Sequence, residues 1–455
     1  MDEAPLTMLQ QKVSGWGRFP QTWSPVLQPL DISEVQAFLR NRREKATPIG
    51  LRRSYADAAL PHESVGIDLT RLRKIIHFDR HAGLISVEAG LSIGDLLRFI
   101  VPKGFFIPVT PGTRFVTLGG AVAHDVHGKN HQVSGSISRF VSALTLMRSD
   151  GEELRLTPGM PLFAATVAGL GLTGIITVVE LQLLPIETAY IVQKRIKAPS
   201  LQSLMMAFEG DAASWPFSVA WVDCLAKGAA LGRGHLILGR PALLDELPTS
   251  LRANPLRVHE DSPWKMPLDA PSVLLHPQPM RWFNKAFFHH QLSSIKEAVV
   301  HYHPFFYPLD TINGWNKLYG KRGFVQFQCV IPYQEAYFVL KKLISMGAES
   351  GRPSFLSVLK KMGTEDLGLL SFGTPGWTLT MDFPMGTETP RLLTKLEKVV
   401  SEAGGRLYLS KDAFLTAEMF RKMYPKTFEW QQIKANADPE NRFTSELASR
   451  LALIP

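Results

Sequence analysis

Two glycine-centred segments of the sequence carry residue types that could hold a flat, phosphorylated ligand. The first, Pro48–Asp57 (PIGLRRSYAD), combines a glycine with two arginines and a serine. Backbone amides beside a glycine and guanidinium groups can together bind a pyrophosphate. The second, Pro111–His131 (PGTRFVTLGGAVAHDVHGKNH), has paired glycines that permit close backbone approach, with Thr, His, Asn and Lys as polar groups. Taken alone, this second segment could also be a plain surface loop.

Other short motifs of the sequence lack the neighbouring elements or partner motifs that their function requires. Gly169–Gly174 fits G-x-G-x-x-G, but a dinucleotide fingerprint follows a strand and opens a helix, whereas here a helix-like stretch comes first. Ser357–Lys360 matches S-x-x-K without the S-D-N and K-T-G partners of penicillin-recognising enzymes. His127 and His131 could share a metal on one helix, but Gly128 between them disfavours that helix. We therefore predict neither a Rossmann site nor a metal site.

The composition is that of a globular protein with a large core. The 455 residues are 45% hydrophobic and 20% charged, which excludes a disordered, fibrous or multi-span membrane chain. At roughly 150 residues per domain, the length predicts two or three domains. The cysteines Cys224 and Cys329 are too few for a disulfide framework or a four-thiolate metal site and suit a reducing compartment. Because the N-terminus also lacks the features of a signal peptide, we expect a cytoplasmic protein.

The positive charge is concentrated in one region. The net charge is +9, and the segment from Arg281 to Lys361 has eleven Lys and Arg against four Asp and Glu. Such an excess is compatible with a solvated face, an anionic substrate or an acidic membrane surface. Nucleic acid is the weakest alternative, because no zinc finger or RNP-like aromatic motif accompanies the charge. We expect no nucleic-acid partner.

The two glycine-centred segments lie in a region that alternates helix-like and strand-like patterns. Asp31 or Ser33 can cap a helix whose apolar face is Val35, Phe38 and Leu39. Alternation of apolar residues and turn signals predict the following strands and helices. The elements expected in the first 190 residues are a helix at 31–43, a strand at 83–90, a helix at 93–100, a hairpin at 141–156 and a strand at 175–184.

Composition changes after about residue 190. Aromatic residues and prolines become more frequent, which indicates a second domain up to about residue 405. The last fifty residues return to balanced charge and end in helical patterns. The elements expected in the second region are strands near 324–331, 354–359 and 377–383 and a helix near 334–346.

The two segments, in this order and separation, resemble the pyrophosphate loop and the isoalloxazine-contacting segment of FAD-dependent oxidoreductases of the vanillyl-alcohol oxidase and p-cresol methylhydroxylase type. Within that group, the sequence is most similar to the oxidase subunits of decaprenylphosphoryl-ribose 2'-epimerases. The likeness extends nearly from end to end. Its blocks include Ser14–Arg18, Pro111–His131, Ala220–Gly228, Trp315–Gly320, Gly323–Gln328, Asp382–Pro384 and Gly404–Asp412.

The resemblance implies an α+β, two-domain fold. Residues 1–190 and 405–455 would form the FAD-binding domain, and residues 191–404 an inserted antiparallel-sheet substrate domain. Relatives that bond FAD covalently often have a histidine next to the serine of the first loop, where this sequence has Arg53, so we expect non-covalent FAD. The implied cofactor-binding residues are Gly50, Arg52, Arg53, Ser54, Tyr55, Thr113, Thr117, Gly119, Gly120, Ala123, His124, Gly128, Asn130, Ile175 and Tyr408.

Lys411 matches the lysine beside the flavin in this family and is implied to be catalytic. A lysine in a dry site can accept the alcohol proton, or it can remain charged and stabilise an alkoxide, and the sequence leaves both open. The implied substrate-binding residues are His127, Gln326, Gln328, Lys360 and Thr380. Three positions depart from the relatives, because Thr380 replaces a cysteine, Thr378 an asparagine and Phe306 a tyrosine. These departures change the expected shape of the pocket.

The implied reaction is the oxidation of a secondary alcohol on a sugar, namely the 2'-hydroxyl of a polyprenylphosphoryl pentose, by hydride transfer to flavin N5. The keto-sugar would pass to a separate reductase. The basic, aromatic segment Arg281–Phe306, with Trp282, Phe283, Phe287 and Phe288, suits peripheral contact with the inner membrane surface. Two alternatives are a soluble alditol or aldonolactone oxidase and a flavin-binding protein without turnover.

Overall fold

A small sheet from the N-terminal part of the chain opens the fold in the computed structural model, which describes residues 8–350, 352 and 356–454. Its strand order is β1-β2-β4-β3, with β1–β2 antiparallel and β4 parallel to both β2 and β3. The strands are β1 (Met8–Ser14), β2 (Gln21–Leu27), β3 (Ala46–Ile49) and β4 (Val65–Asp68). The predicted capped helix is confirmed as α1 (Ile32–Asn41), where Asp31 accepts the Glu34 backbone N–H.

A five-stranded antiparallel sheet follows, in the order β5-β6-β10-β8-β9. It confirms the predicted strands and the hairpin with its Ser149–Gly151 turn. Its strands are β5 (Ile75–Asp79), β6 (Leu84–Glu88), β8 (Val141–Met147), β9 (Glu153–Leu156) and β10 (Ile175–Gln182). The remaining elements here are β7 (Phe105–Phe106), β11 (Leu184–Pro185), α2 (Ile93–Ile100), α3 (Leu118–Ala123), α4 (His131–Ser134) and α5 (Pro161–Thr166).

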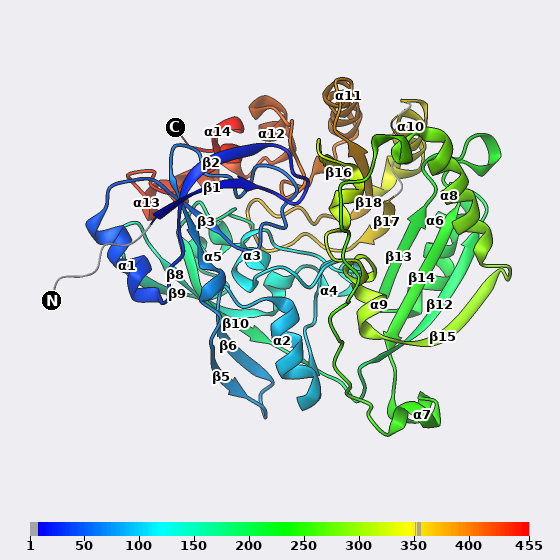
Figure 1. Cartoon of the computed structure of the whole chain (residues 1–455), viewed down its shortest axis with the longest axis horizontal. Helices are drawn as coiled ribbons and strands as arrows, with labels where there is room; N and C mark the ends of the chain where they lie inside the picture. The colour runs from blue at the N-terminus through cyan, green and yellow to red at the C-terminus, as the bar shows by residue number, and fades with distance from the viewer. Residues whose placement is uncertain (1–7, 351, 353–355, 455) are drawn as a thin grey trace.

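An eight-stranded antiparallel sheet forms the other half of the molecule (Figure 1). Its order is β15-β12-β14-β13-β17-β18-β16-β19. The strands are β12 (Tyr190–Ala198), β13 (Phe217–Val222), β14 (Gly234–Pro241), β15 (Ile295–His301), β16 (Phe324–Ile331), β17 (Ser357–Met362), β18 (Gly376–Pro384) and β19 (Arg406–Leu407). Its helices are α6 (Leu201–Gly210), α7 (Thr249–Arg252), α8 (Pro277–His290), α9 (Tyr302–Phe306), α10 (Ala336–Glu349) and α11 (Thr389–Glu402).

The largest hydrophobic core lies on one face of this sheet. Helices α6, α10 and α11 pack there against apolar side chains such as Leu379 and Met381. Residues that alternate with these, such as Thr378 and Thr380, therefore lie on the opposite face. The predicted strand at 354–359 begins later, at Ser357, and its residues 354 and 355 lie outside the described residues.

The C-terminal residues return to the first sheet. After α12 (Ala417–Met423) and α13 (Thr427–Ala437), the chain pairs with β3, where Ala46 N–H donates to Arg442 O (2.7 Å) and Thr444 N–H to Ala46 O (3.0 Å). The last helix is α14 (Glu446–Arg450). In Figure 1 these red helices surround the blue N-terminal strands.

Arg450 links the last helix to the loop after β3 and to the segment after β19. Its guanidinium donates to both Asp57 carboxylate oxygens (2.7 and 3.0 Å) and lies 2.8 Å from Asp412. Because both carboxylates are buried, Arg450→Met leaves two uncompensated charges, and we expect the free energy of unfolding to fall by about 3–5 kcal/mol. Urea denaturation measures this change. The matched control is Arg391→Met, which removes an exposed pair with Glu388 and should cost less than about 1 kcal/mol.

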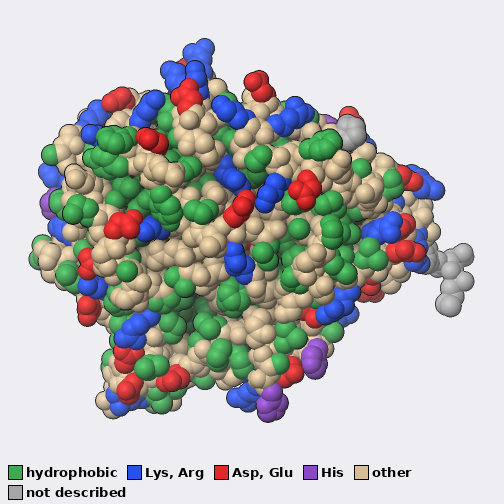
Figure 2. Space-filling view, turned by 180° about the vertical axis from the view of Figure 1, so that it is seen from behind, with side chains coloured by type: hydrophobic (Ala, Val, Ile, Leu, Met, Phe, Trp, Pro, Cys, Tyr) green, Lys and Arg blue, Asp and Glu red, His purple; other side chains and the backbone are tan. Residues whose placement is uncertain are grey.

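The face opposite to that of Figure 1 is hollowed below its centre, and hydrophobic side chains gather around the hollow (Figure 2). Basic and acidic side chains are interspersed over the rest of this face. Within the described ranges, no helix is long and apolar enough to cross a membrane.

Candidate active site

The loop after β3, helix α3 and the turn before β10 enclose a cavity that holds most of the predicted cofactor residues. The cavity contains about 720 Å³ of space between its lining atoms, its open mouth included. The predicted residues that line it are Gly50, Arg52, Arg53, Ser54, Thr117, Gly119, Gly120, Ala123 and His124. The two glycine-centred segments therefore lie against one cavity.

The residues of this cavity fit FAD. A Cβ on Gly50 would lie 2.4 Å from Thr117 Oγ1, and one on Gly119 would lie 2.8 Å from Ala89 Cβ. At these two glycines the loops that line the cavity therefore pack on their neighbours more closely than a larger residue would allow. The Ser54 hydroxyl is buried and has no hydrogen-bond partner among the described residues, which suits a phosphate oxygen as acceptor.

The two arginines of the first segment are held in different ways. Arg52 lies 3.4 Å from the Asp68 carboxylate, whereas Arg53 donates to Phe115 O (3.1 Å) and stacks on the Trp16 ring at 4.0 Å. Burial lowers the pKa of Arg53 to about 10, so the guanidinium remains charged at neutral pH. Positive charge at the cavity is thus available to a pyrophosphate.

The other predicted cofactor residues do not line this cavity. Thr113 donates to Asp310 Oδ1 (2.8 Å), Asn130 to Pro108 O (2.9 Å), and Tyr408 to His124 O (2.9 Å). Gly128 is packed so closely that a Cβ would lie 2.9 Å from Thr110 O. Ile175 is in the hydrophobic core with Met147, and the next residue, Ile176, lines the cavity instead. Tyr55 contacts Lys411, and the cofactor roles of all six residues stay predictions.

The sequence analysis did not assign the Gly169–Gly174 turn to the site. Leu170, Gly171 and Gly174 line the cavity, and the backbone reaches φ +59° at Leu170 and +77° at Gly171. The available signal was the density of glycines, which permits left-handed backbone. As a dinucleotide fingerprint, the motif has its elements in the reverse order.

Lys411 is positioned at the cavity by the segment that follows β19. Tyr55 N–H donates to Ser410 O (2.8 Å), and the Ser410 hydroxyl is 2.7 Å from His124 Nδ1. These bonds tie the segment to both glycine-centred loops. The Lys411 ammonium lies 3.5 Å from the centre of the Tyr55 ring, a cation–π contact. The predicted catalytic residue is therefore adjacent to cavity-lining residues.

The environment of Lys411 prepares it for proton transfer near neutral pH. Burial lowers the pKa of its amine to about 7, an effect that the charge of Lys360 strengthens and that of Asp382 opposes. Burial also raises the pKa of Asp382 to about 7, although Tyr319 and Gln326 donate hydrogen bonds to its carboxylate. The His124 imidazole is neutral at pH 7, because burial, then the charge of Lys411, lowers its pKa to about 4.

The predicted substrate residues of the large sheet share the face opposite its main core. Register pairs Gln328 with Thr380, Gln326 with Asp382, and Lys360 with Thr378, and directly paired residues point to one face. The expectation that Gln326 and Gln328 share a face is confirmed. Lys360 donates to Gly128 O (3.5 Å), and burial lowers its pKa to about 8.

His127 extends from the second glycine-centred segment to this face. The Gln328 amide donates to His127 Nε2 (3.0 Å) and to Thr378 Oγ1 (3.2 Å). Nδ1 of His127 therefore carries the ring proton, and it is buried without a partner among the described residues. Burial lowers the pKa of His127 well below its usual value, so the ring is neutral. It presents a free donor where a sugar oxygen could accept.

Two side chains of the sequence analysis lie elsewhere. Phe306 is buried and packs on Phe106 and Phe217, with ring centres 5.4 and 5.0 Å away, so the departure at this position is within a hydrophobic core. His131, considered as a metal ligand with His127, is 2.8 Å from the Asp366 carboxylate through Nε2, and Gly363 N–H donates to its Nδ1 (3.0 Å). Both ring nitrogens of His131 are thus engaged within the protein.

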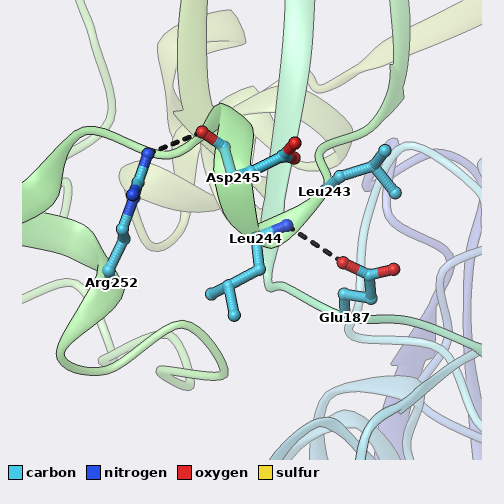
Figure 3. A pocket seen from close by; sticks show the side chains of 5 residues that line it. All are labelled: Glu187, Leu243, Leu244, Asp245 and Arg252. Atoms are coloured by element: carbon cyan, nitrogen blue, oxygen red, sulfur yellow. Dashed lines mark hydrogen bonds between the residues drawn. The ribbon is translucent and has the colours of Figure 1, made fainter.

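A second hollow is formed by residues between 187 and 252, none of which is a predicted site residue (Figure 3). It is lined by Glu187, Leu243, Leu244, Asp245 and Arg252. Glu187 accepts the Leu244 N–H (3.0 Å), and Arg252 donates to Asp245 O (2.6 Å), so local hydrogen bonds occupy its polar groups. We assign it no role.

Comparison with known proteins gives the class of this site. Residues 24–157 match the FAD binding domain family, and residues 378–451 match D-arabinono-1,4-lactone oxidase. Together with the oxidases and dehydrogenases among its relatives, the match to the FAD binding domain shows that the protein is an FAD-dependent oxidoreductase.

The full-length relatives identify the family. The chain is 37% identical to decaprenylphosphoryl-beta-D-ribose oxidase of Mycolicibacterium smegmatis over 98% of both chains, and it belongs to that family. L-gulono-1,4-lactone dehydrogenase of Mycobacterium tuberculosis is 21% identical over 92% of this chain and 93% of its own. L-gulonolactone oxidase of Mus musculus is 28% identical over 34% of this chain and 35% of its own.

Proposed function

We propose that this protein oxidises the 2'-hydroxyl of a polyprenylphosphoryl pentose, similar to decaprenylphosphoryl ribose, to a keto-sugar. The observation that carries the proposal is the half-buried Lys411, which lies beside the FAD cavity and near Gln326 and Gln328 of the large sheet. The full-length similarity to decaprenylphosphoryl-beta-D-ribose oxidase supports this choice of substrate. The keto-sugar product requires a separate reductase to complete an epimerisation, and we propose such an enzyme as a partner.

We propose that one domain binds FAD and the other binds the substrate. Residues 1–190 and 405–455 form the proposed FAD-binding domain, and residues 191–404 the inserted substrate domain of a vanillyl-alcohol-oxidase-type fold. The C-terminal pairing with β3 supports this division. The eight-stranded sheet follows it except at one edge, because β19 (Arg406–Leu407) comes from the returning C-terminal segment. We further propose that FAD is bound non-covalently, because Arg53 stands next to Ser54 where a histidine would form the bond.

The chain's own residues would perform the following steps. Ser54, Arg52 and Arg53 bind the pyrophosphate, and bound FAD supplies a hydride acceptor. Lys411 takes the proton of the substrate hydroxyl as the hydride leaves carbon, which its lowered pKa permits. His127 Nδ1 donates to a sugar oxygen, and Gln326, Gln328, Lys360 and Thr380 orient the sugar in a site from which water is excluded.

The first experiment is an absorption spectrum of the purified protein before and after acid precipitation. We expect flavin bands that leave with the supernatant, because the FAD is not bonded to the chain. Anaerobic addition of a prenylphosphoryl ribose should then bleach the bound flavin. Flavin that stays in the pellet contradicts the non-covalent site, and flavin that no sugar alcohol bleaches favours a binding protein without turnover.

A soluble aldonolactone or alditol oxidase is the second candidate function. The match of residues 378–451 to D-arabinono-1,4-lactone oxidase favours it. Bleaching of the flavin by free lactones or polyols at lower concentrations than by a prenylphosphoryl ribose would decide for this alternative.

We propose that α8 docks on an anionic membrane surface at the cytoplasmic side. Trp282, Phe283 and Phe287 are 70%, 50% and 40% exposed, next to the basic Arg281 and Lys285. Exposed aromatic groups beside cations suit a membrane interface. Two residues of the predicted docking segment do not contribute, because Phe288 and Phe306 are buried in the protein.

Charge removal tests this docking. The double variant Arg281→Gln/Lys285→Gln should bind vesicles of phosphatidylglycerol at least about tenfold more weakly, because each cation near an anionic surface contributes about 1 kcal/mol. The control Lys395→Gln/Lys398→Gln removes two exposed charges from α11, away from this segment. Sedimentation with vesicles that is equal for the first variant and the unchanged protein would reject the docking segment.

A further inference from the structure

The register of the large sheet places a second basic side chain in line with Lys360. Arg195 pairs with Ile237, Ile237 with Val219, and the pairing of Ala220 with Leu359 sets Val219 beside Lys360. Paired residues of neighbouring strands point to the same face. Arg195 and Lys360 therefore share the face of the predicted substrate residues, three strand steps or about 14 Å apart at the backbone.

Lys129 lies over the space between these two residues. Its backbone carbonyl accepts the N–H of Ser218, the neighbour of Val219 on β13 (2.8 Å). Its ammonium donates to Phe305 O and lies 4.5 Å from the Phe305 ring. Burial, then the positive charges of Lys360 and Arg195, lower the pKa of Lys129 to about 7.

The cations on the two faces of the sheet differ in their partners. Lys194 and Lys361, the sequence neighbours of Arg195 and Lys360, point to the opposite face and pair with Asp211 (3.2 Å) and Glu209 (2.8 Å). In the described part of the chain, no carboxylate is within 4.0 Å of the amines of Lys129 and Lys360 or of the Arg195 guanidinium.

Arg195 is moreover incompletely satisfied. Its Nε is buried and has no hydrogen-bond partner among the described residues. Lys129, Arg195 and Lys360 are half-buried. Cations removed from water without a counter-charge are costly to keep charged, so three of them together indicate that an anion supplies the missing charge.

We propose that Lys129, Lys360 and Arg195 form the subsite for the phosphodiester of the lipid-linked sugar, an assignment that rests on the proposed function. The lysines would bind the phosphate oxygens nearer the sugar, and the Arg195 fork the oxygens on the lipid side.

The lipid chain then has an apolar path away from the phosphate. Trp221 and His235 pair in the next row of the same face and stack with ring centres 5.9 Å apart. Phe287 of α8 packs on Trp221 at 4.7 Å, edge to face. This path leads from the phosphate subsite to the exposed aromatic residues of α8, where the prenyl chain would leave the protein.

Binding of farnesyl phosphate and farnesol to the FAD-loaded protein tests the subsite, with the absorbance of the bound flavin or titration calorimetry as readout. Arg195→Gln and Lys129→Met should each raise the dissociation constant of farnesyl phosphate at least about tenfold. The dissociation constant of farnesol should change by less than about twofold, because farnesol has no phosphate to lose a charged donor. Arg195→Lys should retain part of the affinity. Inorganic phosphate should compete weakly with farnesyl phosphate, and this competition should be lost in Arg195→Gln.

Lys194→Gln and Lys361→Gln are the matched controls, because they remove cations from the opposite face of the same strands. Equal affinity for farnesyl phosphate in Arg195→Gln and the unchanged protein would overturn the subsite, and so would an equal loss for farnesyl phosphate and farnesol. The same experiments distinguish failure of the proposed function from failure of the phosphate subsite. If a prenylphosphoryl ribose does not bleach the flavin but phosphate discrimination depends on Arg195, the substrate is wrong and the anion subsite remains.

Discussion

Lys411→Met is expected to slow reduction of the bound flavin by about 10²–10⁴-fold, the range for loss of a positioned proton-transfer or charge-stabilising group. Its half-buried side chain lies against the Tyr55 ring and near Asp382, so methionine fills a similar volume without the amine. FAD binding should persist, since the ammonium is not part of the cavity lining. Anaerobic stopped-flow absorbance with a prenylphosphoryl ribose measures the rate, and Lys422→Met on the exposed side of α12 is the control.

The pH dependence of this step shows which role Lys411 has. Burial lowers the pKa of its amine to about 7, so the amine is mainly neutral above that pH. If it accepts the proton, the rate rises as pH increases through about 7. The negative charge of Asp382 raises the pKa of Lys411, so Asp382→Asn should move the midpoint to lower pH. A rate that falls as pH rises through 7 would instead show that the charged ammonium stabilises the alkoxide.

Gly120→Val is expected to yield colourless protein with less than about a tenth of the normal FAD. Gly120 lines the cavity, and an added Cβ would meet the Thr117 hydroxyl at 2.9 Å and no backbone atom outside its own helix within 4 Å. That hydroxyl caps α3 by accepting the Gly120 N–H, so circular dichroism of the variant checks that the fold is retained. The valine methyl groups would occupy cofactor space, and overpacking of about 1–3 kcal/mol reduces affinity by roughly tenfold or more. The ratio of flavin to protein absorbance after gel filtration measures the loss.

Gly112→Val is the matched control for this variant. A Cβ at Gly112 meets no atom within 4 Å, and the residue is exposed in the same segment. We expect its FAD content to be normal. Added FAD should raise the melting temperature of the control but not of Gly120→Val, because a ligand stabilises only the protein that binds it. Normal flavin content in Gly120→Val would place FAD elsewhere.

Local patterns were sufficient to predict most elements. The cap at Asp31 and the apolar spacing of Val35, Phe38 and Leu39 gave α1, and alternation gave β16 with Gln326 and Gln328 on one face. These patterns are local because backbone geometry fixes which neighbours share a face. The boundaries shifted by a few residues, as at β17, since tertiary pairing decides where a strand begins.

The candidate site could be predicted only in part. Glycines and arginines indicated a phosphate-binding loop, and resemblance supplied Lys411, whose position beside Tyr55 depends on bonds between segments more than 350 residues apart in the chain. The role of the Gly169–Gly174 turn was missed, because its contribution arises from the packing of the turn against Pro48 and the first loop rather than from its motif.

The sequence by itself therefore determined the segments that can approach a flat, phosphorylated cofactor and the faces of the individual strands. Only the tertiary structure decided which charges remain without partners. Lys194 and Arg195 are adjacent in the chain, yet one pairs with Asp211 and the other has a buried Nε with no hydrogen-bond partner among the described residues. The reason is physical, since the pleat sends neighbouring side chains to opposite faces, and the elements packed on each face set the dielectric and the counter-charges.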